Sequence, residues 1–240
     1  MKFTAINGSP RASNGVTWWV LEKFIQGIED AGEKVQVINL ADKKIHHCTG
    51  ELACWFKTPG KCIHKDDMGE ILAGLAPTEN LIIATPVYVD GMTGLMKNFF
   101  DRIVPCADPH FEMRNGHLRH LERGSIKIKR VALVSVCGFF ELDNFNPLVE
   151  HIKAICKNMN AEFSGAVLRP AGPMFPEIPT IHPLFFKLRA LTKAIKQAGN
   201  EFASSGKISA ETASAISADV ITKEDYFKRA NEYFDKASPR

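Results

Sequence analysis

The amino-acid sequence predicts a doubly wound α/β fold, in which a five-stranded parallel sheet carries helices on both faces. One observation and one rule of topology lead to this expectation. Short apolar runs of the β type alternate with longer stretches of helical periodicity between residues 3 and 168. Strands that are each followed by a helix pair in parallel, and their right-handed crossovers place the helices on both sides of the sheet.

Five segments are predicted to be strands because they are short, apolar and bounded by turn residues: 3–6, 34–40, 81–85, 130–136 and 162–168. Helices are predicted between them at 14–31, 66–75, 93–104 and 147–160. In the last of these, Asn146 is expected to be the N-cap and Pro147 the first helical residue. The segments that hold His117 and His120 are expected to be loops.

The character of the chain changes after residue 168, where Pro170, Pro173, Pro176, Pro179 and Pro183 follow one another closely. Proline cannot stand inside a central strand or a helix, so the sheet is expected to end there. We therefore divide the chain into a core domain at 1–169 and a proline-rich connector with a C-terminal helical extension at 170–240. The extension is expected to pack on the core or on a dimer partner.

Two helices are predicted in this extension. The first covers 184–204 and is closed by Gly206, and the second covers 222–236. Thr222 and Asp225 fit a capping box, and Ile221 is placed to pack on Tyr226. Tyr226, Tyr233 and Phe234 make an apolar stripe on the second helix.

Composition excludes several functional classes. The net charge of +3 arises from 30 basic and 27 acidic residues spread along the chain, so no face for nucleic acid is expected. No apolar run approaches the roughly 18 residues that span a bilayer, and the N-terminus lacks the pattern of a signal peptide. We therefore expect no membrane partner and a cytoplasmic location.

The loop after the first strand has the composition of an anion site. Gly8 can adopt backbone angles closed to other residues, and the helix that follows presents N–H groups and a positive dipole end. A phosphate monoester suits these groups, although an ordinary turn with a Ser or Asn cap fits the residues equally well. The candidate phosphate-binding residues are Ser9, Arg11, Ser13, Asn14 and Thr17.

Two further loops are expected at the same edge of the sheet. The third strand leads into Thr85, Pro86, Val87 and Tyr88, with Asp90 and Gly91 just beyond, and the fourth leads into Cys137 and Gly138. Tyr88 offers an aromatic face to a planar ligand, and Gly138 permits close approach of a ring. From the residues alone, Tyr88 is better explained as a half-buried core aromatic. Cys137 is expected to be an inert filler rather than a nucleophile.

The segment from Ile6 to Asn14 resembles the opening signature of NADPH-dependent FMN reductases and iron-sulfur flavoproteins. Asp66-Asp67-Met68, the Thr85–Tyr88 loop and the segment 97–102 follow in the order found in those families. The resemblance implies a flavodoxin-like fold, with FMN phosphate in the first loop and the flavin ring against the second. It also implies a homodimer or homotetramer, because sites in this family often lie at subunit interfaces.

The function that the resemblance implies is an FMN-dependent NAD(P)H oxidoreductase, in which NAD(P)H is a co-substrate and no side chain is an obligatory acid or base. Its small-molecule electron acceptor would be a quinone, a nitro compound, a flavin or a metal ion. An alternative is a flavodoxin-like or iron-sulfur-flavoprotein-like electron carrier fed by a ferredoxin. A nucleotide-binding regulator of the same fold is the non-redox alternative.

Iron-sulfur flavoproteins carry a compact four-cysteine motif, and this chain departs from it. Cys48, Cys54 and Cys62 fit three of the positions, but Glu51 stands at the second. A [4Fe-4S] cluster normally takes four thiolates, so a cluster completed by Glu51 or His64 is disfavoured, as is zinc. We expect the cysteines to lie in a metal-free loop beside the flavin.

Overall fold

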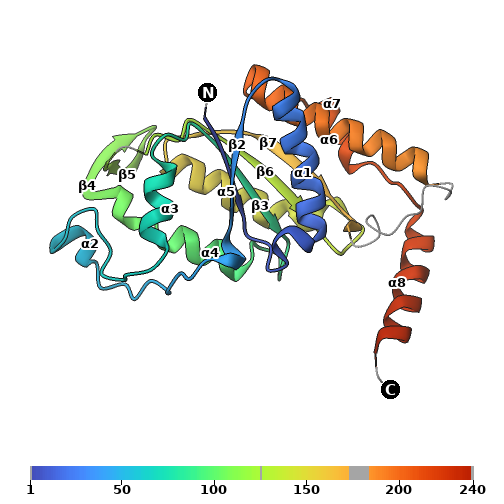
Figure 1. The fold of residues 1–240 in the computed structure, drawn as a ribbon, viewed down its shortest axis with the longest axis horizontal. Helices are drawn as coiled ribbons and strands as arrows, with labels where there is room; N and C mark the ends of the chain where they lie inside the picture. The colour runs from blue at the N-terminus through green and yellow to red at the C-terminus, as the bar shows by residue number, and fades with distance from the viewer. Residues whose placement is uncertain (1, 125, 173–183, 239–240) are drawn as a thin grey trace.

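The computed structural model describes residues 2–124, 126–172 and 184–238 of the 240-residue chain. Pro170 of the proline-rich connector is included, whereas Pro173, Pro176, Pro179 and Pro183 lie outside the described residues. The chain forms a twisted sheet with flanking helices, from which one helix projects near the C-terminus (Figure 1).

The central sheet has five parallel strands in the order β2-β1-β3-β6-β7, which is the flavodoxin-like order. The prediction of the fold class is therefore confirmed. The strand order reverses beside β1, so β1 and β3 flank the switch point at which ligands bind in such sheets. The strands are β1 (Phe3–Asn7), β2 (Val35–Asn39), β3 (Asn80–Pro86), β6 (Arg130–Val136) and β7 (Glu162–Arg169).

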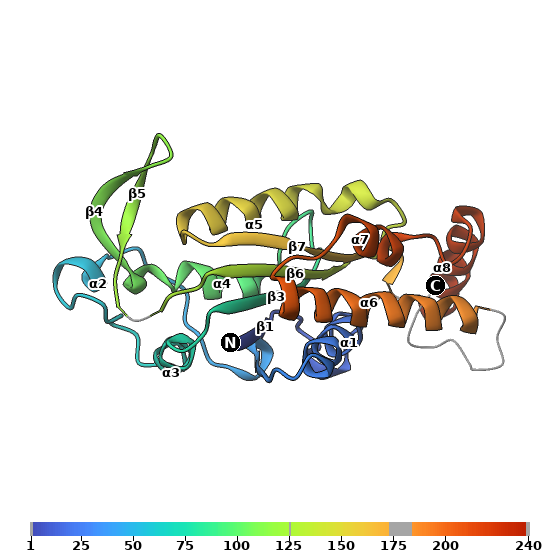
Figure 2. The same ribbon diagram turned by 90° about the horizontal axis from the view of Figure 1, so that it is seen from above.

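Helices cover both faces of this sheet (Figure 2). On one face lie α1 (Val16–Asp30), α6 (Phe185–Ser205) and α7 (Ala210–Ser217). The other face is covered by α3 (Met68–Leu75), α4 (Gly94–Asp101) and α5 (Asn146–Asn158). The other α-helices in the described part of the chain are the short α2 (Ala53–Phe56) and α8 (Lys223–Ala237).

Alternation along the buried strands divides the core into two layers. Ala5, Ile82 and Val134 belong to the cluster under α1 and α6, whereas their neighbours Ile6, Ile83 and Leu133 belong to the cluster under α3, α4 and α5. Successive side chains of a strand point to opposite faces, so near-continuous apolar runs supply both layers at once.

The helices α1 and α6 cross so closely that their backbones touch. A Cβ atom at Gly27 of α1 would lie 1.9 Å from the carbonyl oxygen of Lys196, and one at Gly199 of α6 would lie 2.0 Å from that of Phe24. Neither glycine has a positive φ, so the requirement is for space rather than for backbone freedom. This crossing fastens the C-terminal extension to the core.

A β-hairpin between α4 and β6 was not predicted. Its strands are β4 (Ala107–Arg114) and β5 (His117–Glu122), and Asn115 and Gly116 form the turn with φ values of 51° and 76°. The expectation that His117 and His120 lie in loops is therefore wrong. The His120 ring packs between Phe111 and Trp55, at centroid distances of 4.7 and 4.8 Å.

The predicted N-cap of α5 is also wrong. A 3₁₀ turn at Leu142–Phe145 runs directly into α5, so Phe145 occupies the N-cap position with a helical backbone and Asn146 is already helical. Because the chain enters the helix already wound, no extended position remains at which Asn146 could cap it.

The predicted N-cap of α8 and the predicted closing glycine of α6 are confirmed, but α7 between these two helices was not predicted. Thr222 accepts a hydrogen bond from the backbone N–H of Asp225 at 3.1 Å, and Gly206 closes α6 with a φ of 78°. The described part of the chain contains no helix that is both long and apolar enough to cross a membrane.

We expect Gly199→Ala to destabilise the protein by about 3 kcal/mol, because the added methyl group forces α6 away from the backbone of α1. Gly69→Ala is the matched control, since a Cβ on this α3 residue meets no atom within 4 Å. It should be neutral or slightly stabilising. Urea unfolding of both variants is the measurement, and equal free energies of unfolding would contradict the close crossing.

Candidate functional site

The loop after β1 is shaped by the buried side chain of Asn7. Its amide nitrogen donates to the carbonyl oxygen of Ala12 at 3.2 Å and to Oδ1 of Asn39 at 3.0 Å. Its amide oxygen accepts from the backbone N–H of Ser9 at 3.0 Å. Asn7 was not among the predicted site residues, although it holds the predicted phosphate loop in place.

The helix α1 begins without a side-chain cap. A 3₁₀ turn at Ala12–Asn14 precedes it, Gly15 is the N-cap, and α1 starts at Val16 rather than at the predicted Asn14. The structure therefore does not have the ordinary Ser-capped or Asn-capped turn. The first N–H groups of a helix attract an anion when no cap occupies them.

The predicted phosphate residues surround this helix end. Arg11, Ser13 and Asn14 are exposed beside it, whereas Ser9 and Thr17 are buried. The Ser9 hydroxyl accepts from the backbone N–H of Arg11 at 3.3 Å, so it shapes the turn. A guanidinium, a hydroxyl and an amide beside uncapped N–H groups suit a phosphate dianion.

Gly8 is required for a reason other than the predicted one. Its φ is not positive, but a Cβ atom there would lie 2.8 Å from Cβ of Met96 on α4. The glycine therefore allows the first loop to approach α4 closely, rather than providing unusual backbone angles.

The loop after β3 forms a tight two-residue turn. Tyr88 and Gly91 exchange backbone hydrogen bonds of 3.0 and 3.1 Å, and Val89 and Asp90 between them have φ values of 47° and 61°. Positive φ at both central residues is the type I′ pattern. Val89 is fully exposed and Tyr88 is 51% exposed, so Tyr88 does not belong to the core.

The loop after β6 is built on a buried thiol. The Cys137 sulfur accepts from the backbone N–H of Phe139 at 3.4 Å, and burial raises the pKa of the Cys137 thiol above its ordinary value. The thiol is therefore protonated near neutral pH, in agreement with an inert role. Gly138 is exposed, and a Cβ there would meet no atom within 4 Å, so the space above it is open.

Buried hydroxyl groups join the three loops. Ser135 donates to the carbonyl oxygen of Thr85 at 2.7 Å, and the Thr85 hydroxyl accepts from the backbone N–H of Thr93 at 3.2 Å. Thr93 in turn donates to the carbonyl oxygen of Gly8 at 2.7 Å and caps α4. Thr85 was predicted to contact the ligand. Its side chain is completely buried, and its hydroxyl forms hydrogen bonds within this network.

One residue near the third loop comes from far along the chain. The Tyr226 hydroxyl of α8 donates to the carbonyl oxygen of Gly138, and its ring lies 5.9 Å from that of Phe140. Lys223 forms an ion pair of 2.5 Å with Glu141. The start of α8 is thus attached to the third loop. No local sequence pattern predicted this contact.

Three cysteines, Cys48, Cys54 and Cys62, fit positions of the four-cysteine motif, but they do not form a four-thiolate site. Cys48 is exposed, Cys54 is buried, Cys62 is intermediate, and Glu51 accepts a hydrogen bond from the Thr49 hydroxyl. Among the residues that the structure describes, no group of three or more His, Cys, Asp or Glu side chains is arranged to hold a metal ion. The donor set does not fit a [4Fe-4S] cluster, and the expectation of a metal-free loop stays a prediction.

A buried ion pair anchors this cysteine loop. The Asp66 carboxylate accepts hydrogen bonds from both terminal nitrogens of Arg102, at 2.7 and 3.1 Å, and from the backbone N–H of His46 at 2.8 Å. Arg102 also donates to the carbonyl oxygen of His46 at 2.6 Å. Both side chains are only 1% exposed. Burial would raise the pKa of the Asp66 carboxyl, but Arg102 and His46 hold it well below its ordinary value.

The model of the NADPH-dependent FMN reductase family matches residues 1–139 of this chain. An iron-sulfur flavoprotein of Clostridioides difficile is 30% identical over 183 residues, which cover 68% of this chain and 78% of that protein. An iron-sulfur flavoprotein of Archaeoglobus fulgidus is 34% identical over 115 residues, 48% of this chain and 55% of that protein. The match thus spans about half the length of the latter relative.

Solved structures share the fold. An FMN-dependent NADH-azoreductase of Bacillus anthracis, solved with FMN, has a TM-score of 0.61 and 18% identity, with 85% of this chain and all of that chain covered. An NAD(P)H:quinone oxidoreductase of Methanothermobacter marburgensis has a TM-score of 0.59 and 16% identity, with 84% and 96% covered. At these identities the likeness concerns the fold alone.

We expect Asp66→Asn to lower the free energy of unfolding at pH 7 by about 3–5 kcal/mol, because Arg102 is left buried without its counter-charge. The folded-state pKa of Asp66 lies below the unfolded value of 3.8, so the stabilisation is complete above that value and is lost as pH falls further. The stability difference between wild type and variant should therefore stay constant from pH 7 to about pH 5 and begin to narrow below about pH 4. Urea unfolding between pH 7 and pH 3 is the measurement.

Asp101→Asn is the matched control, because Asp101 forms an exposed ion pair with Lys97 in which both side chains are about half exposed. Exposed pairs of this kind contribute little to stability. A loss for Asp101→Asn as large as that for Asp66→Asn would contradict the role given to the buried pair.

Proposed function

This chain belongs to the NADPH-dependent FMN reductase family, and we propose that it is an FMN-dependent oxidoreductase that takes a hydride from NAD(P)H. The hydride is passed on to a small acceptor such as a quinone, a nitro compound, a free flavin or a metal ion. The observation that carries the proposal is the uncapped N-terminus of α1, with Arg11, Ser13 and Asn14 exposed around it.

In this proposal the first loop binds the FMN phosphate, and the second and third loops bind the flavin ring. The first binds the phosphate through Arg11, Ser13, Asn14 and the N–H groups of α1, with Ser9 and Thr17 behind them. The second and third loops hold the ring between the exposed Tyr88 and the open space above Gly138. Val87, Asp90 and Gly91 complete the proposed ring site, and the buried Thr85, Pro86 and Cys137 support these loops from behind.

Bound FMN supplies the redox chemistry, while the protein positions the flavin and the two substrates. The protonation state of Cys137 supports this division, because a buried and protonated thiol is a poor nucleophile. We assign no side chain the role of acid or base. Glu51 in place of a cysteine supports FMN as the sole redox group.

The proposal is tested with the purified chain loaded with FMN. Anaerobic NADPH or NADH should bleach the flavin absorbance near 450 nm, as dithionite does. Arg11→Ala should raise the Kd for FMN about tenfold, because a charge-assisted hydrogen bond to phosphate is worth roughly 1.5 kcal/mol or more. Fluorescence titration of FMN measures this, and Arg229→Ala, at an exposed position on α8, is the control.

The second candidate function is an electron carrier fed by a ferredoxin, which the iron-sulfur flavoproteins among the relatives favour. Bleaching by reduced ferredoxin but not by NAD(P)H would establish the carrier and exclude the oxidoreductase. A chain that takes up no FMN would exclude both and leave a regulator of the same fold. Iron and sulfide near four per chain would overturn the sole-flavin assignment.

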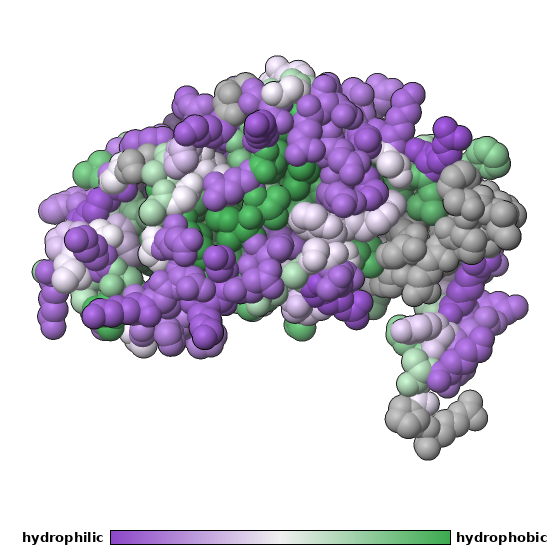
Figure 3. All heavy atoms as spheres, in the orientation of Figure 1, coloured by the Kyte–Doolittle hydropathy of each residue, from purple (hydrophilic) through white to green (hydrophobic). Residues whose placement is uncertain are grey.

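We also propose that α8 packs against a second copy of this chain. Its apolar residues collect on one side of the helix (Figure 3), and Phe227, Tyr233 and Phe234 are 69%, 63% and 58% exposed. A lone helix of 15 residues is marginal in water unless a partner covers its apolar face. Three aromatic side chains of about 150–250 Å² supply much of the roughly 800 Å² that each partner of a stable dimer buries.

Light scattering should show a homodimer or homotetramer for the wild type and a smaller species for Phe227→Glu combined with Phe234→Glu. Lys228→Glu changes a charge on the polar side of α8 and should leave the mass unchanged. A monomeric wild type, or an aromatic double variant with unchanged mass, would disprove the pairing.

A further inference from the structure

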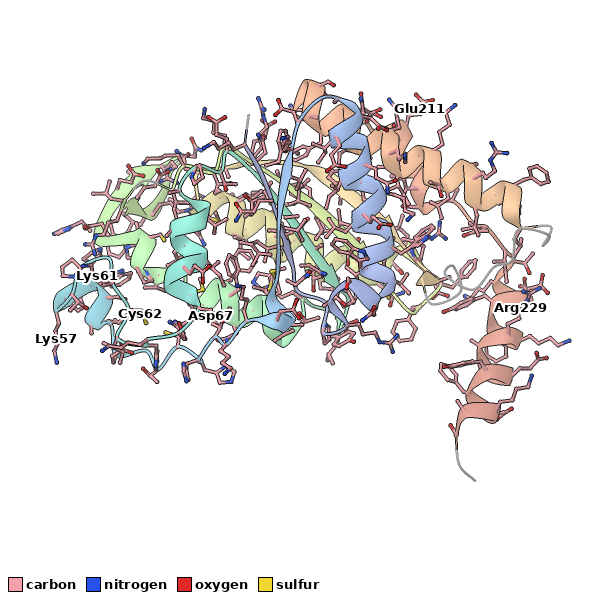
Figure 4. The ribbon with its side chains drawn as sticks, in the orientation of Figure 1. Lys57, Lys61, Cys62, Asp67, Glu211 and Arg229 are labelled. Atoms are coloured by element: carbon pink, nitrogen blue, oxygen red, sulfur yellow. The ribbon has the colours of Figure 1, made fainter. Side chains whose placement is uncertain are left out.

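A cavity of about 390 Å³ lies at the end of the molecule that carries α3 and the β4–β5 hairpin, and none of the three cofactor loops lines it. The loop at 60–64 forms one side of it and α3 the other, and Arg102, Pro105 and Cys106 after α4 complete it. Figure 4 shows Lys61 and Cys62 on that loop and Asp67 just before α3. Small-molecule sites in proteins commonly begin at about this volume.

Small and apolar residues make the α3 side of the cavity. Gly69, Leu72, Ala73 and Ala76 recur at spacings of three and four and so lie on one face of the helix. A Cβ atom at Gly69 would meet nothing within 4 Å, which shows that the space beside this face is open. Such a wall suits the hydrocarbon part of a ligand.

The charged residues that line the cavity are all basic. They are Lys61, Arg102 and Arg123, and no carboxylate is among the lining residues. Arg123 is occupied by Asp108 at 2.6 Å and by the carbonyl oxygen of Cys54 at 3.2 Å. Lys61 is exposed at the rim. Arg102 is likewise paired with Asp66, so the net positive charge of the lining comes from Lys61, and this charge favours an anion as the ligand.

Two buried polar atoms of the lining residues lack a partner. Nε of Arg102 has no hydrogen-bond acceptor in the described structure, although the residue is only 2% exposed and its other two nitrogens bind Asp66 and His46. Nε2 of His64 is likewise buried and without a partner among the described residues. An arginine Nε–H can only donate, and leaving a buried donor unsatisfied is costly. An acceptor group on a ligand would satisfy it.

We propose that this cavity binds a small organic carboxylate, with the carboxylate against Arg102 and His64 and the apolar body along Gly69, Leu72 and Ala73. The apolar wall distinguishes such a ligand from inorganic phosphate, which would leave the wall without a contact. This site is separate from the flavin loops, so it does not depend on the oxidoreductase assignment.

The test is calorimetric titration of the full FMN-loaded chain with benzoate as the probe. Benzoate should bind, benzyl alcohol should bind at least tenfold more weakly, and inorganic phosphate should not compete. Gly69→Leu should weaken benzoate binding at least tenfold by filling the cavity. Gly74→Leu is the matched control on the same helix, where a Cβ meets only the Gln36 side chain at 3.5 Å, and its affinity should stay within twofold.

Retention of FMN by Gly69→Leu shows that the variant is folded. If Gly69→Leu does not fold, Ala73→Leu is used as the cavity-filling variant instead. No benzoate binding by the wild type, equal binding of benzyl alcohol, or unchanged binding in the filled variant would each overturn the proposal. FMN titration run in parallel separates this failure from a failure of the flavin site.

Discussion

The candidate site depends on a buried line of hydroxyl groups that crosses the carboxyl edge of the sheet. Ser135 at the end of β6 binds the backbone of Thr85 at the end of β3, and Thr93 connects Thr85 to Gly8 after β1. Three loops separated by up to 127 positions in sequence are thereby fixed relative to one another. Hydrogen bonds of this kind are strong in a low-dielectric interior and costly to leave unmade, so the edge acts as a single rigid unit.

Most of the fold could be predicted from the sequence, because parallel strands that are buried on both faces have short, continuous apolar sequences. Residues 81–85 and 130–136 have this pattern, and both proved to be central strands. The β4–β5 hairpin was missed because no residue of its strands is buried and they carry no clean alternation, with Pro109 near the start. Its one clear signal was Asn115-Gly116, the dipeptide that type I′ turns favour.

Less of the site could be predicted from the sequence. Motifs contain the residues that contact a ligand, but not the residues that hold those side chains and loops in place. Arg11 and Tyr88 were identified from their loops and from the family resemblance. Asn7 was not, although its side-chain amide holds the first loop through hydrogen bonds with the backbone of Ser9 and Ala12. Asp66 and Arg102 stood in quoted motifs, yet nothing in their local sequence indicated that they pair across 36 positions. Tyr226 reaches Gly138 from 88 positions away, a contact that only the packing of the extension creates.

The close crossing of α1 and α6 has a consequence for biosynthesis. Gly27 and Lys196 are separated by roughly 170 positions, so α1 leaves the ribosome long before the helix that covers it has been made. During that interval Phe24 and Ile28 of α1, both fully buried in the finished protein, have no partner from α6. Non-local contacts of this length slow folding and prolong the exposure of apolar surface. The nascent N-terminal half is therefore the stage of synthesis at which chaperones would be needed most.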